Sequence, residues 1–211
     1  MAHVVLFGDS IFDNKSYVGT RGRDVITHLR EILPDDWQAA LEAVDGSVIE
    51  GVLRQLSSAP PDATHFVISV GGNDAIRNAD VLEMRAGYAA EVFAELAKRK
   101  DLFELQYKAM LGKVLSKNIP TAVCTIYYPN FPDAQMQKLA VTALASFNDV
   151  IIRQAILNGL PILDLRLICN EASDYANPIE PSDKGGKKIA AKIYDLVKTH
   201  DFSENRTQVF S

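Results

Sequence analysis

Short apolar runs alternate along the chain with longer stretches in which apolar residues recur at helical spacing. Runs short enough for strands occur at residues 3–7, 37–44, 64–70, 121–128 and 161–165. The runs HVVLF and THFVISV are continuously apolar, which is typical of strands buried on both faces of a parallel sheet. The longer stretches predict helices at 23–33 and 47–56, two helices within 78–117, and helices at 132–158 and within 183–200.

This alternation of strands and helices is typical of βαβ units around a parallel sheet. We therefore expect an α/β fold, a three-layer α/β/α sandwich with five parallel strands, built as a single domain over residues 1–211. No shift in composition marks a domain boundary. Ser47 is expected to cap the helix at 47–56, and Gly159 to end the helix at 132–158. The polar segment 201–211, DFSENRTQVFS, predicts a loose tail.

Composition narrows the class of protein. The chain has 211 residues, of which 47% are hydrophobic, enough to bury a full core. Charged residues make up 23% and the net charge is −5, so a basic nucleic-acid footprint and a disordered acidic tract are both missing. We expect no nucleic-acid partner. Cys124 and Cys169 lack the spacing of metal ligands and predict buried thiols; no metal or cofactor is expected.

The ends of the chain and its apolar segments bear on localisation. The start MAHVVLFGDS holds only a short apolar run without a basic segment before it, too little for a signal peptide. No segment approaches the roughly 18–20 apolar residues that a membrane span needs. We expect a cytoplasmic protein without a membrane span. The sequence leaves its oligomeric state open.

Small and polar residues follow three of the predicted strands. In open α/β sheets, ligands bind beyond the carboxyl ends of the strands. Those ends carry the sequences GDS at 8–10, DGS at 45–47 and GGND at 71–74. Adjacent strand ends lie about 5 Å apart. The N–H groups of Ser10 and Gly46 and the side chain of Asn73 are therefore able to converge on one point, as stabilisation of an anionic tetrahedral intermediate requires.

The blocks FGDS, VDGS and GGND, in this order, resemble the first three sequence blocks of the GDSL, or SGNH, hydrolases. The resemblance covers nearly the whole chain and implies a flavodoxin-like sandwich and ester hydrolysis. It also implies that Ser10 is the nucleophile, and that the Ser10 and Gly46 N–H groups form an oxyanion hole with the Asn73 side chain. Taken alone, a serine in the sequence GDS is also typical of a residue that caps the start of a helix, so Ser10 keeps this second interpretation.

The fourth block of that family reads Asp-x-x-His-Pro, in which the histidine is the base and the aspartate orients it. This chain has NPIEPSDKGGKKIA at 177–190. Pro181 and Gly185 fit the family pattern, which places Glu180 at the histidine position and Asn177 at the aspartate position. Both members of the dyad are changed.

No histidine is expected to replace the missing base. The four histidines, at 3, 28, 65 and 200, fall in predicted strands, a helix and the tail. Glu180 is then the base, or the site has none. The reference pKa of a glutamate is about 4.3 against about 6.5 for histidine, which costs on the order of tenfold in base strength. Partial burial, or an acidic neighbour such as Asp13, Glu171 or Asp174, would raise that pKa.

Several residues keep two interpretations. Glu180 is a base or an ordinary loop residue. Asn177 either donates an amide N–H to Glu180 or forms a turn before Pro178. Asp9 is expected beside the substrate, bonded to loop amides behind Ser10.

The loop IYYPNFPDA at 126–134 contains Tyr127, Tyr128 and Phe131. These aromatic residues either wall a substrate pocket for an apolar or sugar-like ester or pack in the ordinary way.

Two functions of different classes follow. The first is a serine esterase that cleaves small carboxylic esters, lipids or acylated sugars through an acyl-enzyme on Ser10, with Glu180 as base. The second is a binding protein that keeps the fold but has lost the catalytic dyad. Nucleotide or flavin binding is disfavoured, because the chain lacks a glycine-rich phosphate loop.

Overall fold

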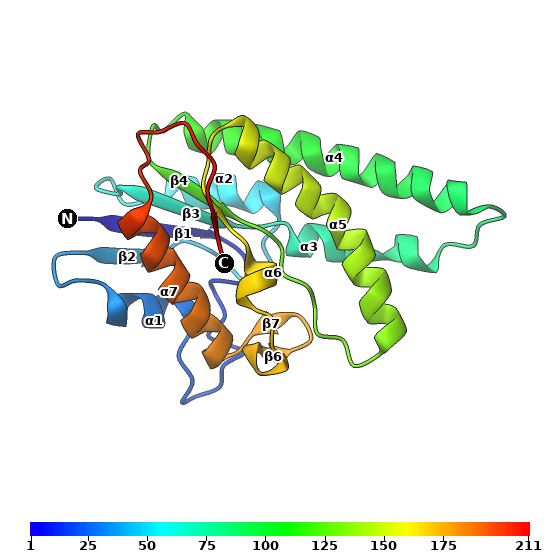
Figure 1. The fold of residues 1–211 in the computed structure, drawn as a ribbon, viewed down its shortest axis with the longest axis horizontal. Helices are drawn as coiled ribbons and strands as arrows, with labels where there is room; N and C mark the ends of the chain where they lie inside the picture. The colour runs from blue at the N-terminus through cyan, green and yellow to red at the C-terminus, as the bar shows by residue number, and fades with distance from the viewer.

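A parallel sheet runs through the middle of the molecule, and helices cover both of its faces (Figure 1). The computed structural model describes residues 1–211. The sheet order is β2-β1-β3-β4-β5-β8, and every pairing is parallel. These strands are β1 (His3–Gly8), β2 (Gln38–Leu41), β3 (His65–Ser69), β4 (Thr121–Cys124), β5 (Ile162–Leu163) and β8 (Val209–Phe210). The α/β/α sandwich predicted from the sequence is confirmed.

The sheet has six strands, so the prediction of five was wrong. The additional strand is β8, which lies in the tail that was expected to be loose. Val209 pairs with Ile162 and Phe210 with Leu163, and the Phe210 side chain is buried. Only two apolar residues form this strand, within an otherwise polar segment, and such a short run carries no recognisable period.

Five long helices form the outer layers. They are α1 (Val25–Ile32), α2 (Ile49–Ser57), α4 (Ala89–Leu115), α5 (Ala134–Leu157) and α7 (Asp183–Thr199). The shorter helices are α3 (Gly72–Arg77), α6 (Leu165–Ile168) and the 3₁₀ turns η1 (Ala79–Glu83) and η2 (Ala172–Asp174). A separate antiparallel pair, β6 (Tyr175–Asn177) and β7 (Glu180–Pro181), lies outside the main sheet.

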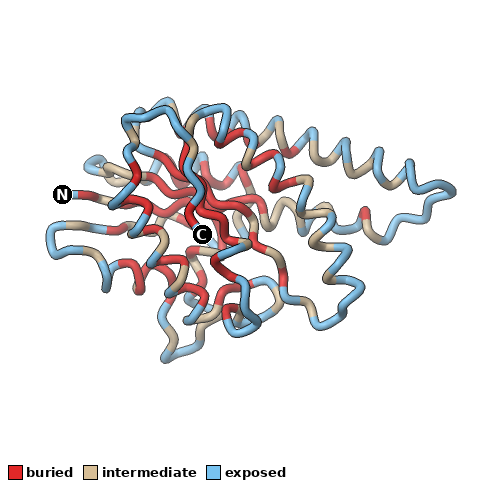
Figure 2. Tube along the Cα trace, in the orientation of Figure 1, coloured by how far each residue is buried: buried red, intermediate tan, exposed pale blue.

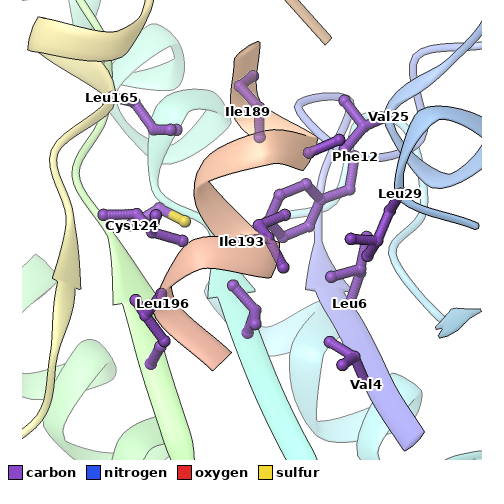
Figure 3. Close-up of a cluster of buried hydrophobic side chains, with 14 of the residues drawn as sticks. Val4, Leu6, Phe12, Val25, Leu29, Cys124, Leu165, Ile189, Ile193 and Leu196 are labelled. Carbon is purple, nitrogen blue, oxygen red and sulfur yellow. The ribbon is translucent and has the colours of Figure 1, made fainter. Parts of the chain in front are cut away.

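The two faces of the sheet bury two separate cores. Successive side chains of a strand point to opposite faces, so Val4 and Leu6 of β1 pack under α1 and α7, as Figure 3 shows, whereas Val5 and Phe7 pack under α2, α4 and α5. Figure 2 shows burial concentrated on the strands and on the helix faces that cover them. The N-terminal half of α4 extends beyond the sheet and is mostly exposed.

The helix ends match the sequence predictions in part. Gly159 follows α5 with a φ of +63°, as expected for the residue that ends a helix. Ser47 does not cap α2. The N-cap is Val48, and the Asp74 carboxylate from the next strand end accepts the Ile49 N–H, at 3.2 Å from Oδ2.

One helix has the length and apolar composition to cross a membrane. This is α5, which the sequence analysis did not single out. Its residues Phe147, Val150 and Ile151 belong to the core beneath the sheet. Core helices of soluble proteins pass the same test, so the observation is weak evidence for a span.

Candidate active site

The turn after β1 fixes the position of Ser10. Gly8 has a φ of +133°, and a Cβ there would lie 1.8 Å from the Ser69 carbonyl oxygen, so only glycine fits. The buried Gln55 side chain forms hydrogen bonds with both polar groups of the Gly8 backbone. The Gly8 N–H donates to Gln55 Oε1 at 2.8 Å, and Gln55 Nε2 donates to the Gly8 carbonyl at 2.8 Å. The backbone therefore leaves the strand in one direction.

Ser10 does not cap a helix. The Asp9 carbonyl accepts the N–H groups of Phe12 and Asp13 at 3.1 Å, which forms an isolated turn. The first helix begins at Val25, and its cap is the Asp24 side chain. The capping interpretation of Ser10 is therefore excluded, and its hydroxyl is free for another partner.

That partner is Glu180. The Ser10 Oγ donates to Glu180 Oε1 at 3.0 Å, and both residues are 6% exposed. Glu180 Oε2 is buried without a hydrogen-bond partner. Burial raises the pKa of Glu180 to about 7, the Ser10 hydroxyl lowers it in part, and the negative charge of Asp45 raises it further.

The acidic neighbour of Glu180 differs from the three that the sequence suggested. Asp45 affects the pKa of Glu180, whereas Asp13, Glu171 and Asp174 are not among its causes. Glu171 and Asp174 instead pair with the ammonium groups of Lys184 and Lys188. These ion pairs tie η2 to α7.

Two buried side chains hold the residues on either side of Glu180. The Tyr127 hydroxyl donates to the Ile179 carbonyl. The Asn14 amide donates to the Pro181 carbonyl at 3.1 Å, and Asn14 Oδ1 accepts the Val25 N–H at 3.0 Å. Asn14 is fully buried. Sequence reasoning missed it, because a lone asparagine in a loop has no pattern that marks it.

Of the two interpretations of Asn177, the structure shows the turn before Pro178. The Asn177 side chain is exposed, and Oδ1 accepts the Ile179 N–H at 2.9 Å within the β6-β7 hairpin. No hydrogen bond joins Asn177 to the Glu180 carboxyl. Nothing in the structure therefore places Asn177 in the orienting role that its sequence position implied.

The three candidate oxyanion donors lie on neighbouring loops. The backbone N–H groups of Ser10 and Gly46 donate to no protein acceptor. Asn73 Nδ2 donates one hydrogen to the Ser47 carbonyl at 3.0 Å, which ties the second and third strand ends together and leaves the other amide hydrogen unused. Gly46 is exposed at the rim, with a φ of +76°. Buried N–H groups are rarely left unused in native proteins, so the N–H of the buried Ser10 is suited to an anionic ligand.

Asp9 lies behind Ser10 and is 2% exposed. Its Oδ1 accepts the Ile11 N–H at 3.2 Å. Burial raises the pKa of Asp9 to about 8, the Ile11 N–H lowers it in part, and the charge of Glu180 raises it. At neutral pH Asp9 is therefore mostly protonated, and Glu180 carries most of the negative charge beside Ser10.

An apolar cavity of about 160 Å³ opens at the Ser10–Glu180 pair. Six residues predicted from the sequence as site residues are among those that line it: Asp9, Ser10, Asn73, Glu180, Tyr127 and Phe131. Tyr128 does not line it, and its carbonyl instead accepts the Tyr175 hydroxyl. Gly46, Asn177 and the four histidines are also outside the lining.

The histidines have other partners. His28, which is buried in α1, lies 3.2 Å from Asp183, and His3 lies 3.1 Å from Asp62. His65 contacts Thr64, and His200 contacts Gln208. No imidazole therefore takes the place of Glu180 beside Ser10.

Comparison with known proteins gives a family match and a set of similar folds. The model of the GDSL-like lipase/acylhydrolase family matches residues 6–188. No curated protein sequence matches.

Three solved structures illustrate the similarity of fold. The lipase Lip_vut3 from a goat rumen metagenome has 16% identity and a TM-score of 0.70, over 92% of this chain and 97% of that one. The acetyl xylan esterase AlAXEase has 21% identity and a TM-score of 0.68, over 92% and 99%. Phospholipase A1 from Streptomyces albidoflavus NA297 has 14% identity and a TM-score of 0.65, over 94% and 99%.

Proposed function

Because the chain belongs to the GDSL-like lipase/acylhydrolase family, we propose that it is a serine ester hydrolase with Ser10 as nucleophile and Glu180 as base. The observation that carries the proposal is the hydrogen bond of 3.0 Å from Ser10 Oγ to Glu180 Oε1, between two residues that line an apolar cavity. A nucleophile within hydrogen-bond reach of a base is the arrangement that acyl transfer requires.

The reaction follows from this geometry. Ser10 Oγ attacks the ester carbonyl carbon while the Glu180 carboxylate accepts the hydroxyl proton. The carbonyl oxygen becomes an oxyanion, which the N–H groups of Ser10 and Gly46 and the amide of Asn73 stabilise. Glu180 then returns its proton to the oxygen of the leaving alcohol, and an acyl-enzyme remains on Ser10.

Water completes the cycle. Glu180 accepts a proton from the water that attacks the acyl-enzyme, and the second tetrahedral intermediate collapses with proton return to Ser10 Oγ. The products are the free acid and the original serine. Formation of an acyl-enzyme predicts a burst of alcohol release with activated esters.

The environment of Glu180 compensates for its low ordinary basicity. Burial raises its pKa from the ordinary value of 4.5 to about 7, which is close to that of an imidazole. The penalty of about tenfold for replacing histidine by glutamate therefore largely disappears. Asp9, which is neutral at pH 7, adds little repulsion to the ionised base.

The test is hydrolysis of 4-nitrophenyl acetate combined with mass spectrometry. Wild type should show a burst, and a serine-directed alkyl phosphonate should add one adduct on Ser10. The Ser10→Ala variant should show neither. If Ser10→Ala hydrolyses the ester at the wild-type rate, Ser10 is not the nucleophile and the proposal is wrong. If the wild type shows no turnover and the phosphonate fails to label Ser10, the binding-protein hypothesis replaces it.

A further inference from the structure

The cavity beside Ser10 is lined by helices as well as by strand ends and the loops that follow them. Its helical wall comes from α3, η1, α4 and α5, which lie to one side of the sheet (Figure 1). Of its 25 lining residues, 17 are hydrophobic. We propose that this cavity binds the acyl part of the substrate, and that the substrate is an uncharged ester with a linear acyl chain of about six to eight carbons. This inference rests on the proposed function and names its substrate class.

Small side chains on facing helices create the space. The cavity is lined by Ala75 of α3, Ala79 of η1, and Ala140 and Ala143 of α5. Larger residues at these positions would fill the cavity. On α5 the lining runs from Met136 to Phe147, about 16 Å along the helix axis. The space is therefore elongated along α5, as a linear chain requires.

The volume sets the length of the chain. A cavity of about 150 Å³ lined by aliphatic and aromatic side chains is enough to bind benzene, a ligand of six carbons. The cavity beside Ser10 measures about 160 Å³ and is partly open to solvent. It encloses an acyl chain of about six to eight carbons, and the end of a longer chain emerges into water.

The charges of the lining exclude an anionic acyl chain. None of the lining residues is a lysine, an arginine or a histidine, so no cation is present to pair with an acid group. The two carboxylic acids of the lining are Asp9 and Glu180. The remaining polar lining residues include Asn78, whose amide already donates to the Asp74 carbonyl at 2.8 Å. A carboxylate at the end of the acyl chain would be desolvated without a partner, which is costly.

The first measurement is kcat/KM of the wild type on 4-nitrophenyl esters from acetyl to dodecanoyl. We expect an increase of about fourfold for each methylene up to octanoyl, because each is removed from water, and a plateau beyond it. The monoester of suberic acid, which has the octanoyl length but ends in a carboxylate, should be slower than the octanoyl ester by more than about a hundredfold. A flat profile with chain length would overturn the inference while leaving the proposed function intact.

The second measurement fills the cavity. Ala143→Phe should lower the octanoyl-to-butyryl ratio of kcat/KM by about tenfold or more. Its far-UV circular dichroism spectrum and urea unfolding show whether the variant is folded. Ala145→Phe is the matched control, because Ala145 is exposed on the same helix and does not line the cavity. Equal losses for all chain lengths in Ala143→Phe, or equal ratios in the two variants, would contradict the proposal.

A binding measurement separates this inference from the failure of catalysis. Titration calorimetry of the Ser10→Ala variant with 1-octanol and with 1-butanol needs no turnover. Octanol should bind at least tenfold more tightly than butanol, and the additional Ala143→Phe substitution should remove the difference. If the wild type hydrolyses no ester and octanol still binds in this way, the cavity assignment holds and the hydrolase proposal falls. Equal affinities for the two alcohols would refute the cavity assignment.

Discussion

The two halves of the candidate site are held in different ways. Ser10 and Asn73 follow strands of the main sheet, so hydrogen-bonded strand pairing sets their relative positions. Glu180 lies in the β6-β7 hairpin outside that sheet, where side chains such as Asn14 and Tyr127 hold its neighbours. The main sheet therefore determines the geometry of the first half. The second half depends on individual side-chain hydrogen bonds, and it carries the proposed base, Glu180.

The largest expected effect on activity comes from a substitution in the β6-β7 hairpin, which carries Glu180. Glu180→Gln keeps the size of the side chain and removes the base, so kcat for 4-nitrophenyl acetate should fall by about 10²- to 10⁴-fold. Glu171→Gln is the control, because Glu171 is an exposed glutamate in the segment before the hairpin. Hydrolysis by Glu180→Gln within threefold of wild type would show that Glu180 is not the base.

In the half of the site that follows strands of the main sheet, a substitution should lower the stability of the fold rather than act on the chemical step. Gly8→Ala places a Cβ against the Ser69 carbonyl at a positive φ, so the free energy of unfolding should drop by about 3 kcal/mol. Gly112→Ala on the exposed side of α4 meets no atom within 4 Å and should stabilise the protein by about 1 kcal/mol. Urea unfolding measures both. A Gly8→Ala variant as stable as wild type would mean that the turn relaxes without cost.

A smaller effect tests the support of Glu180. Tyr127→Phe removes the hydroxyl that donates to the Ile179 carbonyl, and we expect kcat to fall by about tenfold with KM little changed. Tyr175→Phe is matched to it, since the Tyr175 hydroxyl also donates to backbone carbonyls, those of Tyr128 and Cys169, neither of which adjoins Glu180 in the chain. Both variants should lose about 1 kcal/mol of stability. Equal kcat values in the two would remove Tyr127 as a positioning residue.

The pH dependence gives opposite signs for activity and stability. Only the ionised form of Glu180 accepts a proton, so kcat/KM should rise with pH through about 7. In the unfolded chain this group has its ordinary pKa near 4.5, so folding takes up a proton between about pH 4.5 and 7. The contribution of Glu180 to stability is present below pH 4.5 and is lost as pH rises through 7. Urea unfolding measured between about pH 4.5 and 7 should show this loss of stability in the wild type. The part that Glu180 causes should be missing in Glu180→Gln.

The smallest effect concerns the charge beside Glu180. Asp45→Asn removes a negative charge that raises the pKa of Glu180, so the midpoint of the pH profile should move to lower pH and the rate at pH 6 should increase by about twofold. Asp62→Asn, at an exposed site beside His3, should leave the profile unchanged. A midpoint that moves upward, or no movement, would exclude Asp45 as the source of the charge effect.

Sequence patterns predicted the features that repeat or that follow from the sheet. The strand runs and helical spacing gave the sandwich, and the strand-end rule located Ser10, Asn73 and Asp9 beside one cavity. The contact between Ser10 and Glu180 came from the resemblance of the fourth block, not from periodicity. Strand β8 was missed because two apolar residues in a polar tail carry no period.

Contacts between distant side chains were beyond prediction. Asp74 replaces Ser47 as the acceptor at the start of α2, and Asp45 replaces the three suggested acidic neighbours of Glu180. Asn14 links α1 to the hairpin through a single side chain. Each of these contacts depends on where loops from separate strands meet, and a single sequence does not encode that meeting in a local pattern.

The hydrogen bond between Ser10 and Glu180 joins residues 170 positions apart in the chain. During synthesis the serine leaves the ribosome early, whereas the glutamate emerges only when the last helix is about to follow. Under the proposed mechanism, the serine has no base until then and is an ordinary, weakly nucleophilic alcohol. The order of translation then makes hydrolytic capacity arise only together with the finished fold.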